Sequence, residues 1–208
     1  MSSQNSSKRS IIAFAPTGRR GRALLRSRTL QRAAAVGLTV TLSLMAPGVS
    51  GQEAASPDLS DPEVAHVAVT ANAIDVRIAE LAKLRTSQAD VRAFAETMIR
   101  DHQAVNERAA ALAGKLGVTP ADNDVSRSLE EGAAAAMTEL EGLSGAAFDR
   151  AFMAREVAYH QAVLDALDGL LIPTTSNDEL RALLEQVRPV IAAHLEHARM
   201  LQTEVTGG

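Results

Sequence analysis

Apolar residues recur along the chain in steps of three and four, which is the spacing of one face of a helix. The pattern begins at residue 62, and no stretch after it alternates with the two-residue period of a strand. Breaks that contain Gly, Pro or helix-capping residues divide it into five segments. The predicted helices are 62–85, 88–115, 124–141, 145–170 and 178–205.

Four of these helices are long and one is short. Residues 124–141 form the short helix, which lies between two long helical hairpins. This order predicts an all-α fold, an antiparallel four-helix bundle with one short extra helix between the two hairpins.

Three histidines stand on apolar faces near the middle of three different helices. His102, His160 and His194 lie about 14, 15 and 16 residues from the predicted starts of their helices. Because mid-helix positions of an antiparallel bundle share a layer, we expect the three imidazoles within about one turn of one another. Asp75 lies at the midpoint of the first helix. Three imidazoles and a carboxylate are suitable ligands for a transition metal such as Zn, Cu or Fe.

Three further residues extend this candidate site. Asp101 precedes His102 and is expected to bind the metal or to hold a ligand. Glu156 lies four residues before His160 and therefore shares its face. His197, three residues after His194, is a candidate fourth ligand. The alternative is a structural polar layer without metal, which fixes the register of a helical interaction module.

Catalysis is not indicated by any motif. Di-iron bundles carry Glu-x-x-His pairs, but the residues three before the layer histidines are Ile99, Val157 and Ile191. Signatures of hydrolases and phosphate loops are also missing from the sequence. The sequence leaves enzymatic activity open and favours a non-catalytic role.

Charge is distributed unevenly along the chain. Eight of the 21 basic residues lie in residues 1–52, which contain no acidic residue, so 13 basic residues accompany all 25 acidic ones in the remainder. The resulting net charge of −12 argues against nucleic acid and anionic membrane as partners. It does not identify a protein partner or an oligomeric state.

The first 51 residues have the pattern of an export signal. A basic stretch ends at Arg32, the apolar stretch 33–46 is too short to span a bilayer, and small residues follow up to Gly51. We therefore expect an export signal over 1–51, a polar leader over 52–61 and a helical domain over 62–205, with a periplasmic location. An uncleaved N-terminal membrane anchor is the alternative. The absence of cysteine fits an exported protein and excludes thiolate metal sites.

Three stretches resemble a known family. They are "ELAKLRTSQADVRAFAETMIRDHQAVN" (80–106), "LSGAAFDRAFMAREVAYHQAVL" (143–164) and "ELRALLEQVRPVIAAHLEHARML" (179–201). These resemble the bacterial exported proteins named after domain of unknown function 4142, over about residues 62–205. The resemblance implies a ferritin-like bundle and export from the cytoplasm, but no defined activity.

Two departures from the family bear on the site. The family often has Glu where this chain has Asp75, and a second Asp-His pair where this chain has Tyr159 and His160. The sequence as a whole thus favours an exported helical protein with a metal-handling or stress-protective role.

Overall fold

The computed structural model describes residues 58–207, and every regular element in this part of the chain is helical. The prediction of an all-α protein is therefore confirmed. The export signal, and the leader up to residue 57, lie outside the described residues. The elements are α1 (Asp61–Arg85), α2 (Ala89–Leu116), α3 (Asp124–Glu141), α4 (Gly145–Ala166), the π-helical turn η1 (Leu167–Leu171), α5 (Ile172–Thr174) and α6 (Asp178–Gly207).

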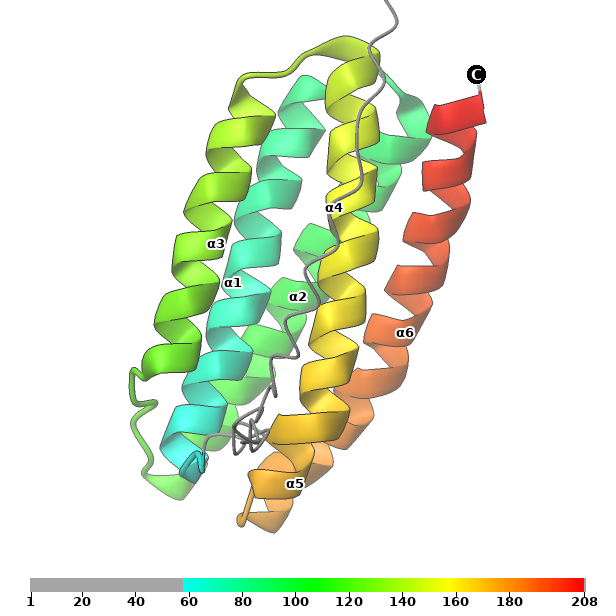
Figure 1. The fold of residues 1–208 in the computed structure, drawn as a ribbon. Coiled ribbons are helices and arrows are strands. Elements are labelled where there is room, and N and C mark those ends of the chain that lie inside the picture. Colours follow the sequence, from blue (N-terminus) through cyan, green and yellow to red (C-terminus); the bar gives the residue numbers. More distant parts are fainter. Residues whose placement is uncertain (1–57, 208) are drawn as a thin grey trace, which may run out of the picture. The chain divides into compact units, whose positions relative to one another are not determined.

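The helices pack side by side (Figure 1). Helices α1 and α2 form one hairpin, α4 and α6 form a second pair, and α3 packs mainly against α1. Helix α2 also contacts α6, and α1 also contacts α4, so the two pairs face each other. Within residues 58–207, none of the helices is both long and apolar enough to cross a membrane.

Local chemistry explains where the helices begin and end. Ser60 is the N-cap of α1, and its backbone N–H donates to Oε2 of Glu63 at 2.9 Å. Asn123 caps α3 by accepting from the backbone N–H of Ser126 at 3.0 Å. Gly117 is the C-cap of α2, and its φ of 64° is accessible to glycine at little cost.

Asp61, the first residue of α1, binds a distant loop through its side chain. Its two carboxylate oxygens accept from the backbone N–H groups of Ser176 at 2.7 Å and Asn177 at 3.0 Å. The side chain thus ties the start of α1 to the loop that precedes α6.

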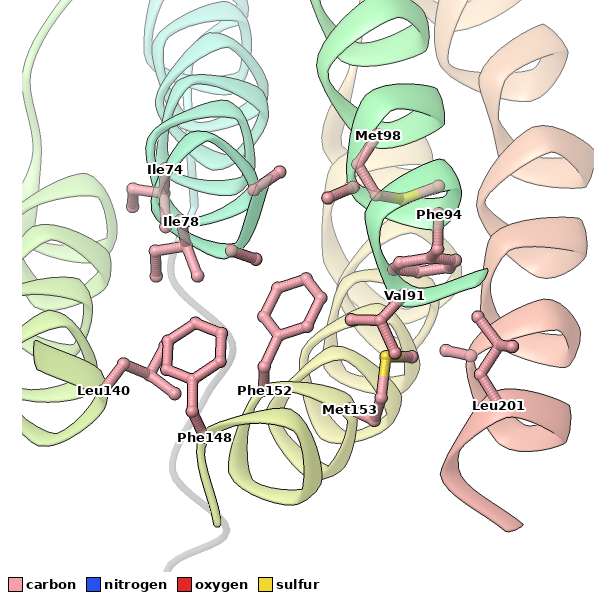
Figure 2. Packing of buried hydrophobic residues seen from close by; sticks show 14 of the residues in the cluster. Ile74, Ile78, Val91, Phe94, Met98, Leu140, Phe148, Phe152, Met153 and Leu201 are labelled. Atoms are coloured by element: carbon pink, nitrogen blue, oxygen red, sulfur yellow. The ribbon is translucent and has the colours of Figure 1, made fainter. Parts of the chain in front are cut away.

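Two apolar clusters fill the space between the helices. One cluster contains Phe94, Phe148 and Phe152 (Figure 2), and the rings of Phe94 and Phe152 are inclined at 69° with their centroids 6.2 Å apart. The second cluster contains Val64 and Leu184. Burial of each such side chain contributes about 1.5–3 kcal/mol.

The helices carry buried polar residues between these two clusters. On α2, Met98 belongs to the first cluster and Val105 packs against the second, and His102 lies between them in sequence. On α4, His160 likewise lies between Phe152 and Leu164. The polar layer therefore occupies the middle of the helices, enclosed by apolar packing on both sides.

Candidate metal centre

Four helices contribute buried polar side chains to one layer. Asp75 comes from α1, His102 from α2, Glu156 and His160 from α4, and His194 from α6, and none of them is more than 6% exposed. The ring centroids of the three histidines lie 5.3, 5.5 and 5.7 Å apart. One ring nitrogen of each lies within 4.8 Å of the other two.

His102 has its two ring nitrogens in different environments. Its Nδ1 lies 2.6 Å from Oδ1 of Asn72, and the Asn72 amide is oriented by its Nδ2, which donates to the carbonyl of Ala68 at 3.0 Å. Because Oδ1 of Asn72 accepts, Nδ1 of His102 carries the proton, and the lone pair of the neutral ring is on Nε2. Nε2 lies 3.1 Å from Oδ2 of Asp75, with which it forms an ion pair when the ring carries a second proton; in the neutral ring neither atom has a hydrogen-bond partner.

His160 and His194 repeat this arrangement with other partners. Nδ1 of His160 donates to the backbone carbonyl of Glu156 at 2.9 Å, and its Nε2 has no partner. Nε2 of His194 donates to Oδ2 of Asp101 at 3.0 Å, and its Nδ1 has no partner. Asp101 itself is fixed by Nε of Arg100 at 2.8 Å.

All three imidazoles thus present an unpaired, buried nitrogen on one side and a hydrogen-bonded N–H on the other. A second hydrogen bond of this kind fixes the tautomer and orientation of histidines that bind metals. Burial lowers the pKa of His160 to about 4 and also lowers the pKa of His194. Both rings are therefore neutral at physiological pH, as metal ligation requires.

A pair of buried carboxylates adjoins the histidines. Asp75, Glu156 and His160 offer ligand atoms within 4.8 Å of one another. Arg155 is hydrogen-bonded to Glu156, its Nη1 lies 3.3 Å from Oδ1 of Asp75, and its guanidinium lies 4.3 Å from the ring centroid of Tyr159. The guanidinium therefore supplies positive charge to the carboxylate side of the layer.

The two carboxylates differ in their protonation. Burial raises the pKa of Glu156 well above its ordinary value, and the charge of Asp75 raises it further. Burial also opposes ionisation of Asp75, but at the low pH where Asp75 titrates a hydrogen bond from protonated His102 and the positive charges of His102, His160 and Arg155 outweigh it, and the pKa of Asp75 lies below its usual range. Asp75 is accordingly the ionised member of the pair at neutral pH.

The remaining predicted residue, His197, is not brought into this group. It is half-buried, and its ring lies edge-on to Phe94 at a centroid distance of 5.2 Å. Tyr159, which precedes His160, donates its hydroxyl to the carbonyl of Ala71 at 2.8 Å.

Sequence reasoning missed Asn72 and Arg155. Asn72 lies three residues before Asp75, on the same face of the helix. Asparagine is unfavourable inside a helix unless its amide is hydrogen-bonded, so its presence there could have indicated a polar partner. Arg155 precedes Glu156 directly, and nothing in the local pattern distinguishes it from an exposed arginine.

Comparison with known proteins finds a matching family and a solved structure of similar fold. The family described as "Domain of unknown function (DUF4142)" matches residues 45–201. None of the curated proteins matches the chain. The solved structure titled "CopM in the Cu(II)-bound form" is similar in fold, with a TM-score of 0.54 and 13% sequence identity, and the match covers 71% of this chain and 99% of that one.

Proposed function

This chain belongs to the family of domain of unknown function 4142, and we propose that it binds one transition-metal ion through His102, His160 and His194. Two observations carry the proposal: one ring nitrogen of each histidine lies within 4.8 Å of the other two, and each histidine has one buried ring nitrogen without a hydrogen-bond partner. Each unpaired nitrogen is the one opposite a hydrogen-bonded N–H, so in the neutral form of the ring it carries the lone pair that a metal ion requires.

The unpaired atoms favour a metal over a purely structural polar layer. A layer that only fixes helix register is expected to satisfy its buried polar groups, because each unpaired one is destabilising. A second proton on His102 would pair only its Nε2 with Oδ2 of Asp75, whereas one metal ion can bind a nitrogen of all three histidines. Five atoms of the layer have no hydrogen-bond partner. They are Asp75 Oδ2, His102 Nε2, Glu156 Oε2, His160 Nε2 and His194 Nδ1.

The charges of the layer support a single ion on the histidine side. Arg155, whose side chain is 14% exposed, lies beside both Asp75 and Glu156 and already supplies positive charge there. A second cation beside these carboxylates would meet the guanidinium. Asp75 remains close enough to His102, at 3.1 Å, to serve as the carboxylate ligand of an ion held by the histidines.

The ligand set favours Cu(II) among the metals that the sequence leaves open. Neutral imidazoles suit Cu, Zn, Fe and Ni, and the general order of affinity puts Cu(II) above the others. The protein of similar fold is described in a Cu(II)-bound form, which supports testing copper first. Zn(II) is the second choice for three imidazoles and a carboxylate.

The burial of the ligands favours metal binding over catalysis. His102, His160 and His194 are 4%, 1% and 6% exposed, which leaves little access for a substrate beside the ion. Catalytic metal sites keep an open coordination position, whereas structural and storage sites are closed. We therefore propose an exported, periplasmic metal-handling or stress-protective role, with α1, α2, α4 and α6 forming an antiparallel ferritin-like four-helix bundle around the ion.

The test is metal binding by purified protein. We expect about one Cu(II) per chain by elemental analysis after dialysis, and an electron paramagnetic resonance spectrum with nitrogen hyperfine structure from imidazole ligands. Single substitutions His102→Gln, His160→Gln and His194→Gln should abolish tight binding. Circular dichroism of each variant checks that the helices persist.

Two histidines outside the layer provide matched controls. His66 and His197 belong to neither group of neighbouring ligand atoms, so His66→Gln and His197→Gln should bind copper like the unaltered protein. If no copper or zinc remains after dialysis, or if the layer variants bind as well as the controls, the metal proposal is wrong and the structural polar layer is favoured.

A further inference from the structure

A cavity of about 390 Å³ lies between α1, α2, η1 and α6, close to the polar layer. Its wall includes Ala68 of α1, Val105 and Ala109 of α2, and Leu184 and Val187 of α6. Asn72, which holds His102, also lines it. The cavity is therefore distinct from the space between the three histidines but adjacent to it.

Small side chains create this space. Helix α1 contributes Ala65 and Ala68, and α2 contributes Ala109 and Ala113, opposite leucines of α6. Well-packed protein interiors contain few voids larger than a water molecule. An apolar cavity of about 150 Å³ is enough to bind benzene, and ligand pockets typically measure about 300–1,000 Å³. The cavity is thus large enough for a molecule of two fused or linked rings.

The charge of the wall selects a neutral ligand. Among the described residues that line the cavity, Asp61 alone is charged, and both of its carboxylate oxygens are occupied by the backbone N–H groups of Ser176 and Asn177. A charged ligand would lose its hydration without gaining an opposite charge, which is strongly unfavourable.

One polar atom in the wall favours a ligand that carries a hydrogen-bond donor. Oδ1 of Asn106 is buried and has no partner. The other two amides in the wall are already bonded: that of Asn72 to Ala68 and His102, and that of Asn177, whose Oδ1 accepts from the backbone N–H groups of Glu179 and Leu180. An unpaired buried acceptor is destabilising until a donor reaches it.

From this geometry we propose that the cavity binds a neutral apolar molecule with one hydroxyl or N–H group, which donates to Asn106. The apolar wall contacts the body of the ligand and Asn106 fixes its orientation. Small-molecule sites usually combine a mostly apolar lining with a few polar groups in this way. This site goes beyond the proposed metal centre and does not require the metal.

The test uses N-phenyl-1-naphthylamine, a neutral aromatic probe with a single N–H whose fluorescence increases in apolar surroundings. Saturable binding of one probe per chain is expected. The cavity-filling substitutions Ala109→Leu and Ala68→Leu should each weaken binding at least tenfold, and Asn106→Leu should weaken it several-fold. Ala93→Leu, on the exposed face of α2, is the matched control and should leave binding unchanged.

Competition separates the two parts of the proposal. 1-Naphthol should displace the probe, whereas 1-naphthoate, which has the same ring system and a negative charge, should not. Absence of saturable binding, or equal binding by the Ala109→Leu, Ala68→Leu and Ala93→Leu variants, would overturn the cavity as a binding site. Equal competition by naphthoate would overturn the selection of a neutral ligand. His160→Gln should bind the probe normally, so failure of the metal site and failure of this site are distinguishable.

Discussion

Asn72 and His102, thirty residues apart in sequence, are joined by a 2.6 Å hydrogen bond from the histidine Nδ1 to the asparagine Oδ1. This bond decides which nitrogen of His102 faces the centre of the layer. Because the Asn72 amide is itself bonded to the carbonyl of Ala68, the acceptor is held in place by the backbone of α1. The orientation of a ring on one helix is thus set by a side chain on another.

Replacement of Asn72 should weaken metal binding without removing any ligand. Asn72→Leu removes the acceptor that fixes the His102 ring, and loss of such a partner typically lowers metal affinity about 10–100-fold. Asn72→Asp retains an acceptor at the same position and should bind at least as tightly as the unaltered protein. Competitive titration against a copper chelator measures both. Equal affinity in the Leu variant would mean that the hydrogen bond does not position His102.

Replacement of Arg155 should destabilise the fold strongly. Arg155→Met removes a positive charge 3.3 Å from the ionised Asp75, which is fully buried, and the loss of one member of a buried ion pair typically costs about 3–5 kcal/mol. Urea denaturation of the metal-free protein measures the change. The exposed pair of Arg188 and Asp168 supplies the control, since Arg188→Met should cost no more than about 1 kcal/mol. Similar losses in both variants would contradict the assigned role of Arg155.

Truncation of Phe152 should destabilise the fold while leaving the site chemistry intact. Phe152 is fully buried between Phe94 and Phe148, with ring centroids 6.2 Å from each, and Phe152→Ala typically costs about 3–5 kcal/mol. Leu84 is 82% exposed, so Leu84→Ala should change stability by no more than about 0.5 kcal/mol. Urea denaturation compares them, and copper stoichiometry per folded chain should be unchanged in both.

The metal-free protein should lose stability as the pH falls. The pKa of His160 is lowered to about 4 in the folded state, against an ordinary value of 6.5, because the ring is buried. Between these pH values the unfolded chain takes up a proton that the folded chain does not, so the free energy of unfolding decreases as the pH falls from 6.5 to 4. The loss is on the order of 3 kcal/mol for this residue.

Thermal unfolding in the presence of a chelator, measured across that pH range, checks this expectation. His160→Gln removes the titrating group and should flatten the dependence. A dependence that is as steep in the variant as in the unaltered protein would assign the loss of stability to other groups.

The sequence determined the helices because their signals are local. Apolar spacing and the residues at helix ends predicted α1, α2, α3 and α6 within two residues of their observed bounds. The continuous helix 145–170 was the exception, since α4 gives way to the π-helical turn Leu167–Leu171 at its end. A π turn differs from an α turn by one hydrogen-bond register, which side-chain periodicity over so few residues does not report.

The sequence also predicted that His102, His160 and His194 would share a layer, because their distances from the helix starts are similar. It could not predict which nitrogen of each ring faces inward, because the partners of two of the rings come from other helices. Nor could it decide between His194 and His197 as the ligand from this helix, since a small rotation of α6 would turn His197 toward the layer.

Only the tertiary structure decided the surroundings of the layer. Asn72, Arg155 and the alanines of the cavity have ordinary helical positions in the sequence, and their roles depend on which helix faces which. The pairing of Asp75 with Arg155 joins residues 80 positions apart. Helix formation follows from neighbours along the chain, whereas charge compensation, ring orientation and empty space follow from the packing of helices, which no local pattern encodes.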